Sequence, residues 1–184
     1  MNGRVRNRNL GQGLDRTDRR VLRKDRFWRS LGGLSGERFD DGPFPRNGFQ
    51  SWRKAMAYEG SRQVGFMRRL FELRSWYKLV PDQSVVASGF GDGEDHVQAA
   101  RAEDGSFLIA YLPQGHVVGI HMAKISGKKI KARWYDPREG TWREIGEYAN
   151  SGTHEFVAPS QGDRSDWILV LDDAEKGYPT ERFK

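Results

Sequence analysis

The sequence contains no cysteine. This absence excludes disulfide bonds, thiolate nucleophiles and cysteine-ligated zinc sites, although it does not identify a compartment. Long apolar runs are also missing, because no stretch approaches the ~18 consecutive apolar residues of a membrane-spanning helix. The N-terminus from Met1 carries arginine and asparagine without an apolar core, so no signal peptide is visible. We therefore predict no membrane partner.

An overall excess of acidic residues is absent too: the 184 residues carry a net charge of +6. Residues 1–60 hold 14 Lys and Arg against 7 Asp and Glu, a difference of +7, and the remaining 17 against 18 give −1. The positive excess therefore lies entirely in the first third of the chain. Such a basic segment could bind phosphates or form the outer face of a helix. No nucleic-acid-binding motif accompanies it, so nucleic acid is not the predicted partner.

The first 82 residues contain helix signals separated by glycine-rich loops. Residues 1–16 mix glycine, arginine and asparagine and are predicted to be a disordered basic arm. Residues 17–82 are predicted to be helical, with one helix over roughly 18–31 and a short one after Ser51. A better one is capped by Ser61 and carries apolar residues at helical spacing, namely Val64, Met67, Leu70 and Phe71.

Residues 83–173 form a train of short apolar runs separated by turn signals. Asp104-Gly105 and Asp136-Pro137 are strong turn signals. The run 107–112 is apolar at every position, as in a central strand covered on both faces. About eight strands are predicted, near residues 84–88, 96–102, 107–112, 117–122, 130–135, 142–145, 153–157 and 167–171. This pattern predicts a mainly β fold, an antiparallel β-sandwich, followed by a polar tail at 174–184.

Residues suited to catalysis or metal binding do not assemble into a recognisable motif. The densest group of potential metal ligands, within residues 92–96, fits a plain acidic loop better than a calcium loop, because its spacing matches no EF-hand. The four histidines lack zinc-motif spacing, and no Gly-x-Ser-x-Gly nucleophile elbow is present. We predict no catalytic residue, no metal site and no cofactor.

Aromatic residues are the better candidates for a ligand surface. Trp134, Tyr135 and Trp142 flank one predicted hairpin, and such rings stack on sugar or proline faces. The alternative is that Trp134 belongs to the core, Trp142 covers an edge and Tyr135 is an ordinary strand residue. A second aromatic group, Trp76 and Tyr77 with Leu79, is predicted to pack between the helices and the sandwich.

Six motifs, in order along the chain, resemble a family of apiosidase-like bacterial glycoside hydrolases. They are Trp76-Tyr-Lys-Leu-Val-Pro-Asp-Gln83, Ala99-Ala-Arg-Ala102, Asp104-Gly-Ser-Phe107, Ala110-Tyr-Leu-Pro-Gln-Gly115, Trp134-Tyr-Asp-Pro-Arg138 and Asp166-Trp-Ile-Leu-Val-Leu-Asp172. In that family a (β/α)8 barrel precedes a C-terminal β-sandwich named for collagen binding. The resemblance implies that residues 17–82 are the helical remnant of a truncated barrel.

The resemblance also implies where the chemistry lies. A barrel needs about 250 residues, so the family's catalytic residues would belong to strands that this chain lacks. We therefore expect a non-catalytic accessory sandwich that binds collagen-like protein or polysaccharide, or braces a catalytic barrel. The alternative is a subunit or fragment of a hydrolase with a separately encoded barrel. The sequence does not fix the compartment, and the resemblance implies an exported protein, periplasmic or extracellular, if Met1 is not the true start.

Overall fold

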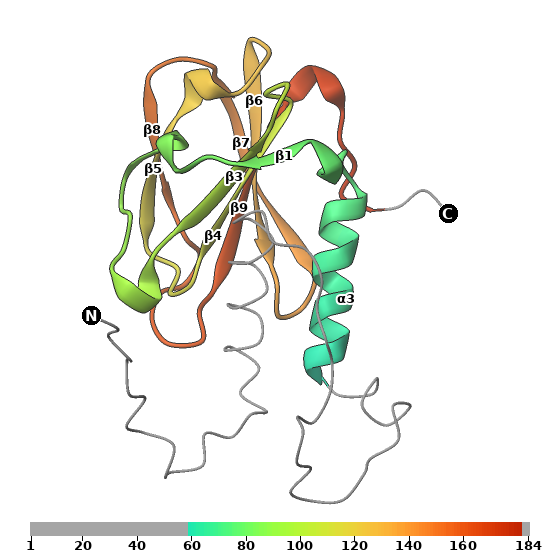
Figure 1. The fold of residues 1–184 in the computed structure, drawn as a ribbon, viewed down its shortest axis with the longest axis vertical. Coiled ribbons are helices and arrows are strands. Elements are labelled where there is room, and N and C mark those ends of the chain that lie inside the picture. The colour runs from blue at the N-terminus through green and yellow to red at the C-terminus, as the bar shows by residue number, and fades with distance from the viewer. Residues whose placement is uncertain (1–58, 182–184) are drawn as a thin grey trace, which may run out of the picture.

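The computed structural model describes residues 59–181, which form two antiparallel sheets and one long helix (Figure 1). Six strands form the larger sheet in the order β1-β3-β4-β9-β6-β7, and three form the smaller one in the order β2-β5-β8. The strands are β1 (Leu79–Pro81), β2 (Val86–Ser88), β3 (Gln98–Ala102), β4 (Phe107–Leu112), β5 (Val117–His121), β6 (Lys129–Asp136), β7 (Thr141–Ala149), β8 (Thr153–Val157) and β9 (Trp167–Asp173). The long helix is α3 (Glu59–Glu72).

Five short 3-10 turns join these elements. They are η1 (Trp76–Lys78), η2 (Gln83–Val85), η3 (Gly93–Asp95), η4 (Met122–Lys124) and η5 (Ala174–Lys176). The first of them, η1, connects α3 to β1 and therefore carries the chain from the helix into the sandwich.

The space between the sheets is filled by alternate residues of the strands. On β4, Leu108, Ala110 and Leu112 point into this inter-sheet core, and Leu169 and Leu171 do so from the adjacent β9. The smaller sheet contributes residues such as Val118, Ile120 and Phe156. This arrangement is an antiparallel β-sandwich, as the period-two pattern predicts.

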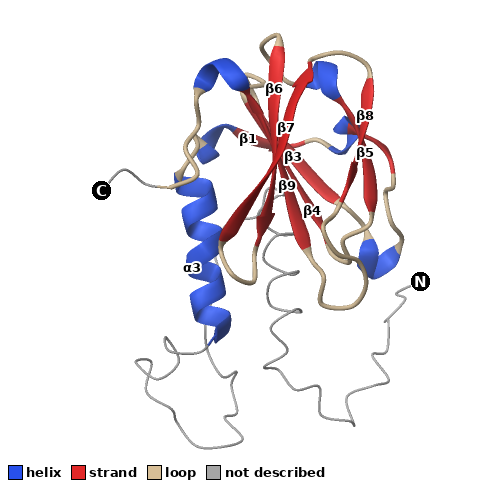
Figure 2. Ribbon diagram, turned by 180° about the vertical axis from the view of Figure 1, so that it is seen from behind, coloured by secondary structure: helices blue, strands red, loops and turns tan. Residues whose placement is uncertain are grey.

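A second core forms on the outer face of the larger sheet, under α3. Phe107, Ile109 and Tyr111 of β4 face this side, because successive side chains of a strand point to opposite faces. The helix contributes Phe66 and Leu70 to the same cluster. Figures 1 and 2 show α3 running beside the strands. The strand β4 is therefore buried on both faces, and its prediction as a central strand is confirmed.

The turn between β6 and β7 fits closely under the helix. Gly140 has a φ of +71°, and a Cβ there would lie 2.7 Å from Cδ1 of Phe66. Glycine is therefore required at this position both by the backbone conformation and by the ring packed against it. Phe66 of the helix therefore packs directly against the backbone at Gly140.

The predicted antiparallel β-sandwich is confirmed, with two differences in its strands. Nine strands are present where about eight were expected, because the three-residue strand β1 is too short to show a period of its own. The strand β7 extends to Ala149, past a register shift opposite Ala132 and Arg133 that alternation alone does not reveal. The helices predicted upstream of residue 59 lie outside the described residues, so the barrel remnant stays a prediction.

Candidate functional site

Trp134, one of the three predicted ligand-binding residues, lies in the inter-sheet core. Its side chain is 4% exposed and packs edge-to-face on Trp167, with 6.4 Å between the ring centroids. A ring in this position stabilises the sandwich and has no face open to solvent. The structure thus gives Trp134 the packing role that the sequence offered as the alternative.

Tyr135 and Trp142 lie together on the opposite face of the larger sheet, under α3. Their ring centroids are 4.8 Å apart. Tyr135 is buried, and its hydroxyl donates a hydrogen bond to the carbonyl oxygen of Phe66 at 2.9 Å. Burial raises the pKa of Tyr135 well above its usual range, because the phenolate would lose its hydration. Trp142 is only partly buried, whereas Trp134 and Tyr135 are buried. Ligand binding stays a prediction, and Trp142 is the residue of the three whose ring a ligand could reach.

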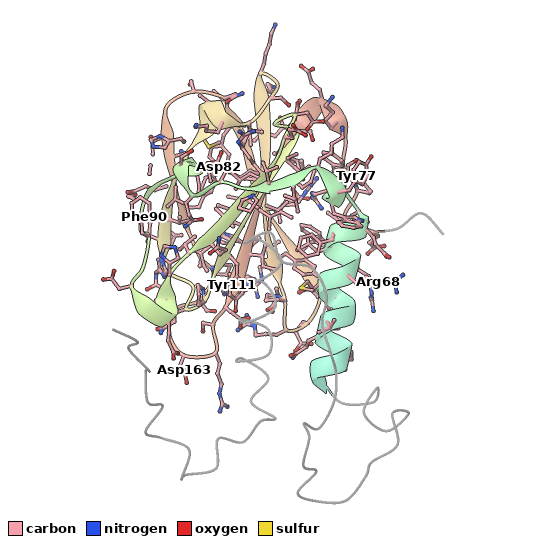
Figure 3. All side chains as sticks on the ribbon, in the orientation of Figure 1. Arg68, Tyr77, Asp82, Phe90, Tyr111 and Asp163 are labelled. Atoms are coloured by element: carbon pink, nitrogen blue, oxygen red, sulfur yellow. The ribbon has the colours of Figure 1, made fainter. Side chains whose placement is uncertain are left out.

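The predicted interdomain residues divide into a packed one and two exposed ones. Leu79 packs against the cluster under α3. Trp76 is 56% exposed and Tyr77 72% exposed, and their rings meet edge-to-face with centroids 6.4 Å apart. Figure 3 shows Tyr77 at the junction of α3 and β1. The pair forms an exposed aromatic surface on the connector between α3 and β1. Its predicted role in packing against another domain stays a prediction.

Directly before this aromatic pair, a buried arginine joins the connector to the larger sheet. Arg74 donates from Nε to Oδ1 of Asp172 at 2.8 Å and from Nη2 to Oδ2 at 2.6 Å. Both side chains are almost completely buried, at 0% and 2% exposure. Such a two-point guanidinium–carboxylate pair fixes the orientation as well as the distance. It holds the end of α3 against β9.

Asp172 is shared with a second arginine from β6. Arg133 donates from Nη1 to Oδ2 of Asp172 at 2.9 Å, and from Nε to Oε1 of Glu144 at 2.8 Å. The network therefore links the connector, β9, β6 and β7 through two carboxylates, Asp172 and Glu144. A buried carboxylate is costly unless its oxygens are hydrogen-bonded, and the two arginines satisfy both oxygens of Asp172.

Arg74 also lies between two aromatic rings. Its guanidinium carbon is 5.1 Å from the ring centre of Trp142 and 5.5 Å from that of Tyr178. These contacts stabilise the cation through the ring faces. The two rings do not offer an oxygen that could accept a hydrogen bond from the guanidinium. Among the residues that the structure describes, Nη1 of Arg74 is buried without a hydrogen-bond acceptor.

An open pocket of about 400 Å³ lies beside this arginine. It is lined by residues 72–77 and by Tyr178. The pocket thus combines the exposed aromatic pair with a guanidinium whose Nη1 has no acceptor among the described residues. We refer to Arg74, Trp76, Tyr77, Tyr178 and the pocket between them as the junction site.

The remaining sequence candidates do not form a site among residues 59–181. No group of three or more His, Asp or Glu side chains there is arranged to hold a metal ion. The acidic residues of the 92–96 loop lie on η3 and next to it. Nε2 of His116 is hydrogen-bonded to the carbonyl oxygen of Gly89 at 2.9 Å. No helix in the described part is long and apolar enough to cross a membrane.

A model of one protein family matches residues 80–172 of the chain, from β1 to the penultimate residue of β9. This family is described as "Putative collagen-binding domain of a collagenase". The chain belongs to it. The matched span begins three residues after Tyr77, so the junction site lies where the chain enters the collagen-binding family domain. No curated protein matches the sequence.

Two solved structures are similar to this collagen-binding family member. One, titled "Glycoside hydrolase", has a TM-score of 0.76 and 26% sequence identity, and the match covers 91% of this chain and 40% of the other. The second is a glycoside hydrolase family 5 protein from Bacteroides vulgatus ATCC 8482, with a TM-score of 0.74, 25% identity, and 88% and 38% of the two chains covered. The chain thus spans about 40% of the length of these hydrolases. The predicted resemblance to a hydrolase-associated sandwich is confirmed.

Arg74 and its ion-pair partner Asp172 were not predicted as functional residues from the sequence. Arg74 follows a helix in a segment rich in arginine, and Asp172 directly follows the apolar run 167–171 as the penultimate residue of β9. One signal was available: a carboxylate directly after a wholly apolar run needs a cationic partner if it is buried. The 98-residue separation of the pair left that partner undetermined.

Proposed function

We propose that this chain is a non-catalytic accessory domain of a glycoside-hydrolase-like protein, and that it contacts the catalytic domain through the junction site. In this proposal residues 83–173 are the accessory sandwich, 17–82 the helical part of the catalytic side, 1–16 a basic arm and 174–184 a tail. Membership of the collagen-binding family and the likeness to parts of two hydrolases support the accessory role.

The observation that carries the proposal is the exposure of Trp76 and Tyr77. Two large rings at 56% and 72% exposure leave apolar surface in water on a short connector. Covering it would gain roughly 25 cal/mol for each Å² removed from water. Aromatic residues are also enriched at the centres of protein interfaces. Because the pair lies just before the family domain, the covering surface is best supplied by the catalytic barrel that the family resemblance implies upstream of the sandwich.

The exposed side of α3 adds positive charge to the surface around Trp76 and Tyr77. Arg62, Arg68 and Arg69 are exposed, and Arg68 is paired with Glu72 at 2.6 Å. A partner surface with acidic residues would complement this face, and the association rate would then fall as salt screens the charges. The proposal therefore includes an acidic rim on the catalytic domain.

The test uses the Bacteroides vulgatus hydrolase named above, expressed without the part that matches this chain. Binding of the 184-residue chain to that protein is measured by calorimetry. Wild type should bind, and the double variant Trp76→Ala/Tyr77→Ala should bind at least tenfold more weakly, because truncated interface anchors typically cost 1 kcal/mol or more each. Phe90→Ala is the matched control, since Phe90 is 46% exposed on a distant loop (Figure 3). Equal affinities for the double variant and wild type would refute the docking proposal.

Binding to collagen or polysaccharide is the second candidate, favoured by the family description and by the partly exposed Trp142. Co-sedimentation of the chain with fibrillar collagen and with insoluble plant polysaccharide tests it. Retention by either material that is lost in Trp142→Ala would replace docking as the main role. Glycosidase activity of the chain alone would contradict the non-catalytic role, whereas activity only with an added barrel would favour the separately encoded alternative.

A further inference from the structure

We infer that Arg74 is the recognition residue of the junction site, and that its Nη1 donates a hydrogen bond to a backbone carbonyl oxygen of the catalytic domain. This inference rests on the proposed function and identifies the chemistry of the partner. It assigns to Arg74 a role beyond the ion pair with Asp172.

The geometry divides the guanidinium into a used and an unused edge. Nε and Nη2 are taken by Asp172, as described above. Nη1 has no acceptor among the described residues, although the side chain is completely buried. A buried N–H without a partner costs about 1–3 kcal/mol, so the site gains stability when an oxygen reaches it. Arg74 lines the pocket, which is where such an oxygen can enter.

The surrounding charges favour a neutral oxygen over a carboxylate. Arg74 and Arg133 are the two cations of the network, and Asp172 and Glu144 are the two carboxylates that they bind. The charges of these four groups balance. A fifth, negative group would be left without a counter-charge, and it would also approach Glu72 on the pocket wall. A backbone carbonyl supplies the acceptor without adding a charge.

The movable wall of the pocket is Tyr178. This residue follows Gly177, which has a φ of +60°, and its hydroxyl donates to Oγ of Ser106 at 3.1 Å. The ring packs edge-to-face on Phe107 with centroids 5.6 Å apart. A partly exposed side chain held by one hydrogen bond can shift more readily than Trp142, which lies on a paired strand. The partner's carbonyl would reach Nη1 on the Tyr178 side.

Two conservative variants separate recognition from folding. Arg74→Lys keeps a positive charge beside Asp172 but removes the planar donor edge. Arg133→Lys is the matched control, because Arg133 shares the same carboxylate but does not line the pocket. Both are measured for thermal stability and for calorimetric affinity toward the Bacteroides vulgatus protein described above. Arg74→Lys should weaken binding about tenfold to a hundredfold, as expected for a hydrogen bond from a charged donor, and Arg133→Lys by less than threefold.

A second measurement needs no variant. Arginine-labelled NMR spectra of the wild-type chain should show the Nη protons of Arg74 shifting and exchanging more slowly on binding, with those of Arg133 unchanged. Equal affinity losses in the two variants, or an unchanged Arg74 signal in the complex, would overturn the inference even if the Trp76→Ala/Tyr77→Ala variant confirms docking. If the wild-type chain does not bind, the docking proposal fails and the inference fails with it.

Discussion

Arg74 and Asp172 are 98 positions apart in the sequence and form a two-point ion pair with distances of 2.8 and 2.6 Å. The pair joins the end of the only long helix among residues 59–181 to the last strand of the larger sheet. Because Asp172 also accepts from Arg133, one carboxylate binds two buried guanidinium groups. The stability of the helix–sheet contact should therefore depend strongly on this residue.

Replacing Asp172 with alanine is expected to lower the free energy of unfolding by about 3–5 kcal/mol, because it leaves the buried Arg74 without its ion-pair partner. Urea denaturation followed by circular dichroism measures the change. Asp104→Ala provides the comparison, since Asp104 pairs with Lys78 at 2.7 Å but both side chains are at least 40% exposed. Its effect should be far smaller, because water screens exposed pairs. Similar losses in the two variants would contradict the buried network.

Gly140→Ala is expected to disrupt the seating of α3. The substitution forces alanine into a φ of +71° and places its Cβ against the ring of Phe66. Gly152→Ala is the control, since Gly152 has a φ of +67° and no atom within 4 Å of the added Cβ. Backbone strain of about 1–2 kcal/mol should be common to both, with an additional loss of about 1–3 kcal/mol at position 140 alone.

The same prediction can be checked by compensation. In a Phe66→Ala background the ring atoms nearest to Gly140 are gone, so Gly140→Ala should cost no more than Gly152→Ala. Guanidinium chloride denaturation of Gly140→Ala and Gly152→Ala, each in the wild-type chain and in the Phe66-substituted chain, gives the comparison. If Gly140→Ala remains equally costly without the ring, the steric explanation fails.

Trp134→Ala and Trp76→Ala should differ sharply in the isolated chain. Trp134 fills the inter-sheet core, so its removal is expected to cost about 3–5 kcal/mol. Trp76 is 56% exposed, and its removal should change the free energy of unfolding by no more than about 0.5 kcal/mol. Differential scanning calorimetry of both variants is the measurement. A large loss for Trp76→Ala in the chain alone would show that this ring packs within the chain.

Stability should fall in acid partly through Asp136. Burial disfavours the charged carboxylate, but hydrogen bonds from the side chain and backbone of Arg138 outweigh this effect and lower the pKa of Asp136 below its ordinary value. A lowered pKa in the folded state contributes stability above the unfolded value of about 3.9, and this contribution is lost as the pH falls below it. Asp136→Asn should flatten the dependence of unfolding free energy on pH between about 5 and 2.

Arg138→Gln checks the cause of that effect. If Arg138 lowers the pKa of Asp136, this variant should flatten the same part of the stability profile, and the double variant should add little. A profile as steep as that of wild type in either single variant would show that other groups control the acid transition.

The class of fold and most of the strands could be predicted from local sequence patterns. The alternation of apolar residues and the turn signals at Asp104-Gly105 and Asp136-Pro137 are local, so they could be recognised without knowing which strands pair. The run from Phe107 to Leu112 showed a strand buried on both faces for the same reason. The family resemblance could also be recognised, because its motifs are contiguous stretches of sequence.

Which aromatic rings are exposed to solvent and which charges are buried depends on how the strands and the helix pack, and could not be predicted from the sequence. Trp134 and Tyr135 are neighbours in sequence, but β6 sends one ring into the inter-sheet core and the other under α3, and both are buried. Trp76 and Tyr77 remain exposed because the chain passes from helix to sheet there. The partner of Asp172 could not be predicted, because an ion pair across 98 residues depends on how the helix docks on the sheet.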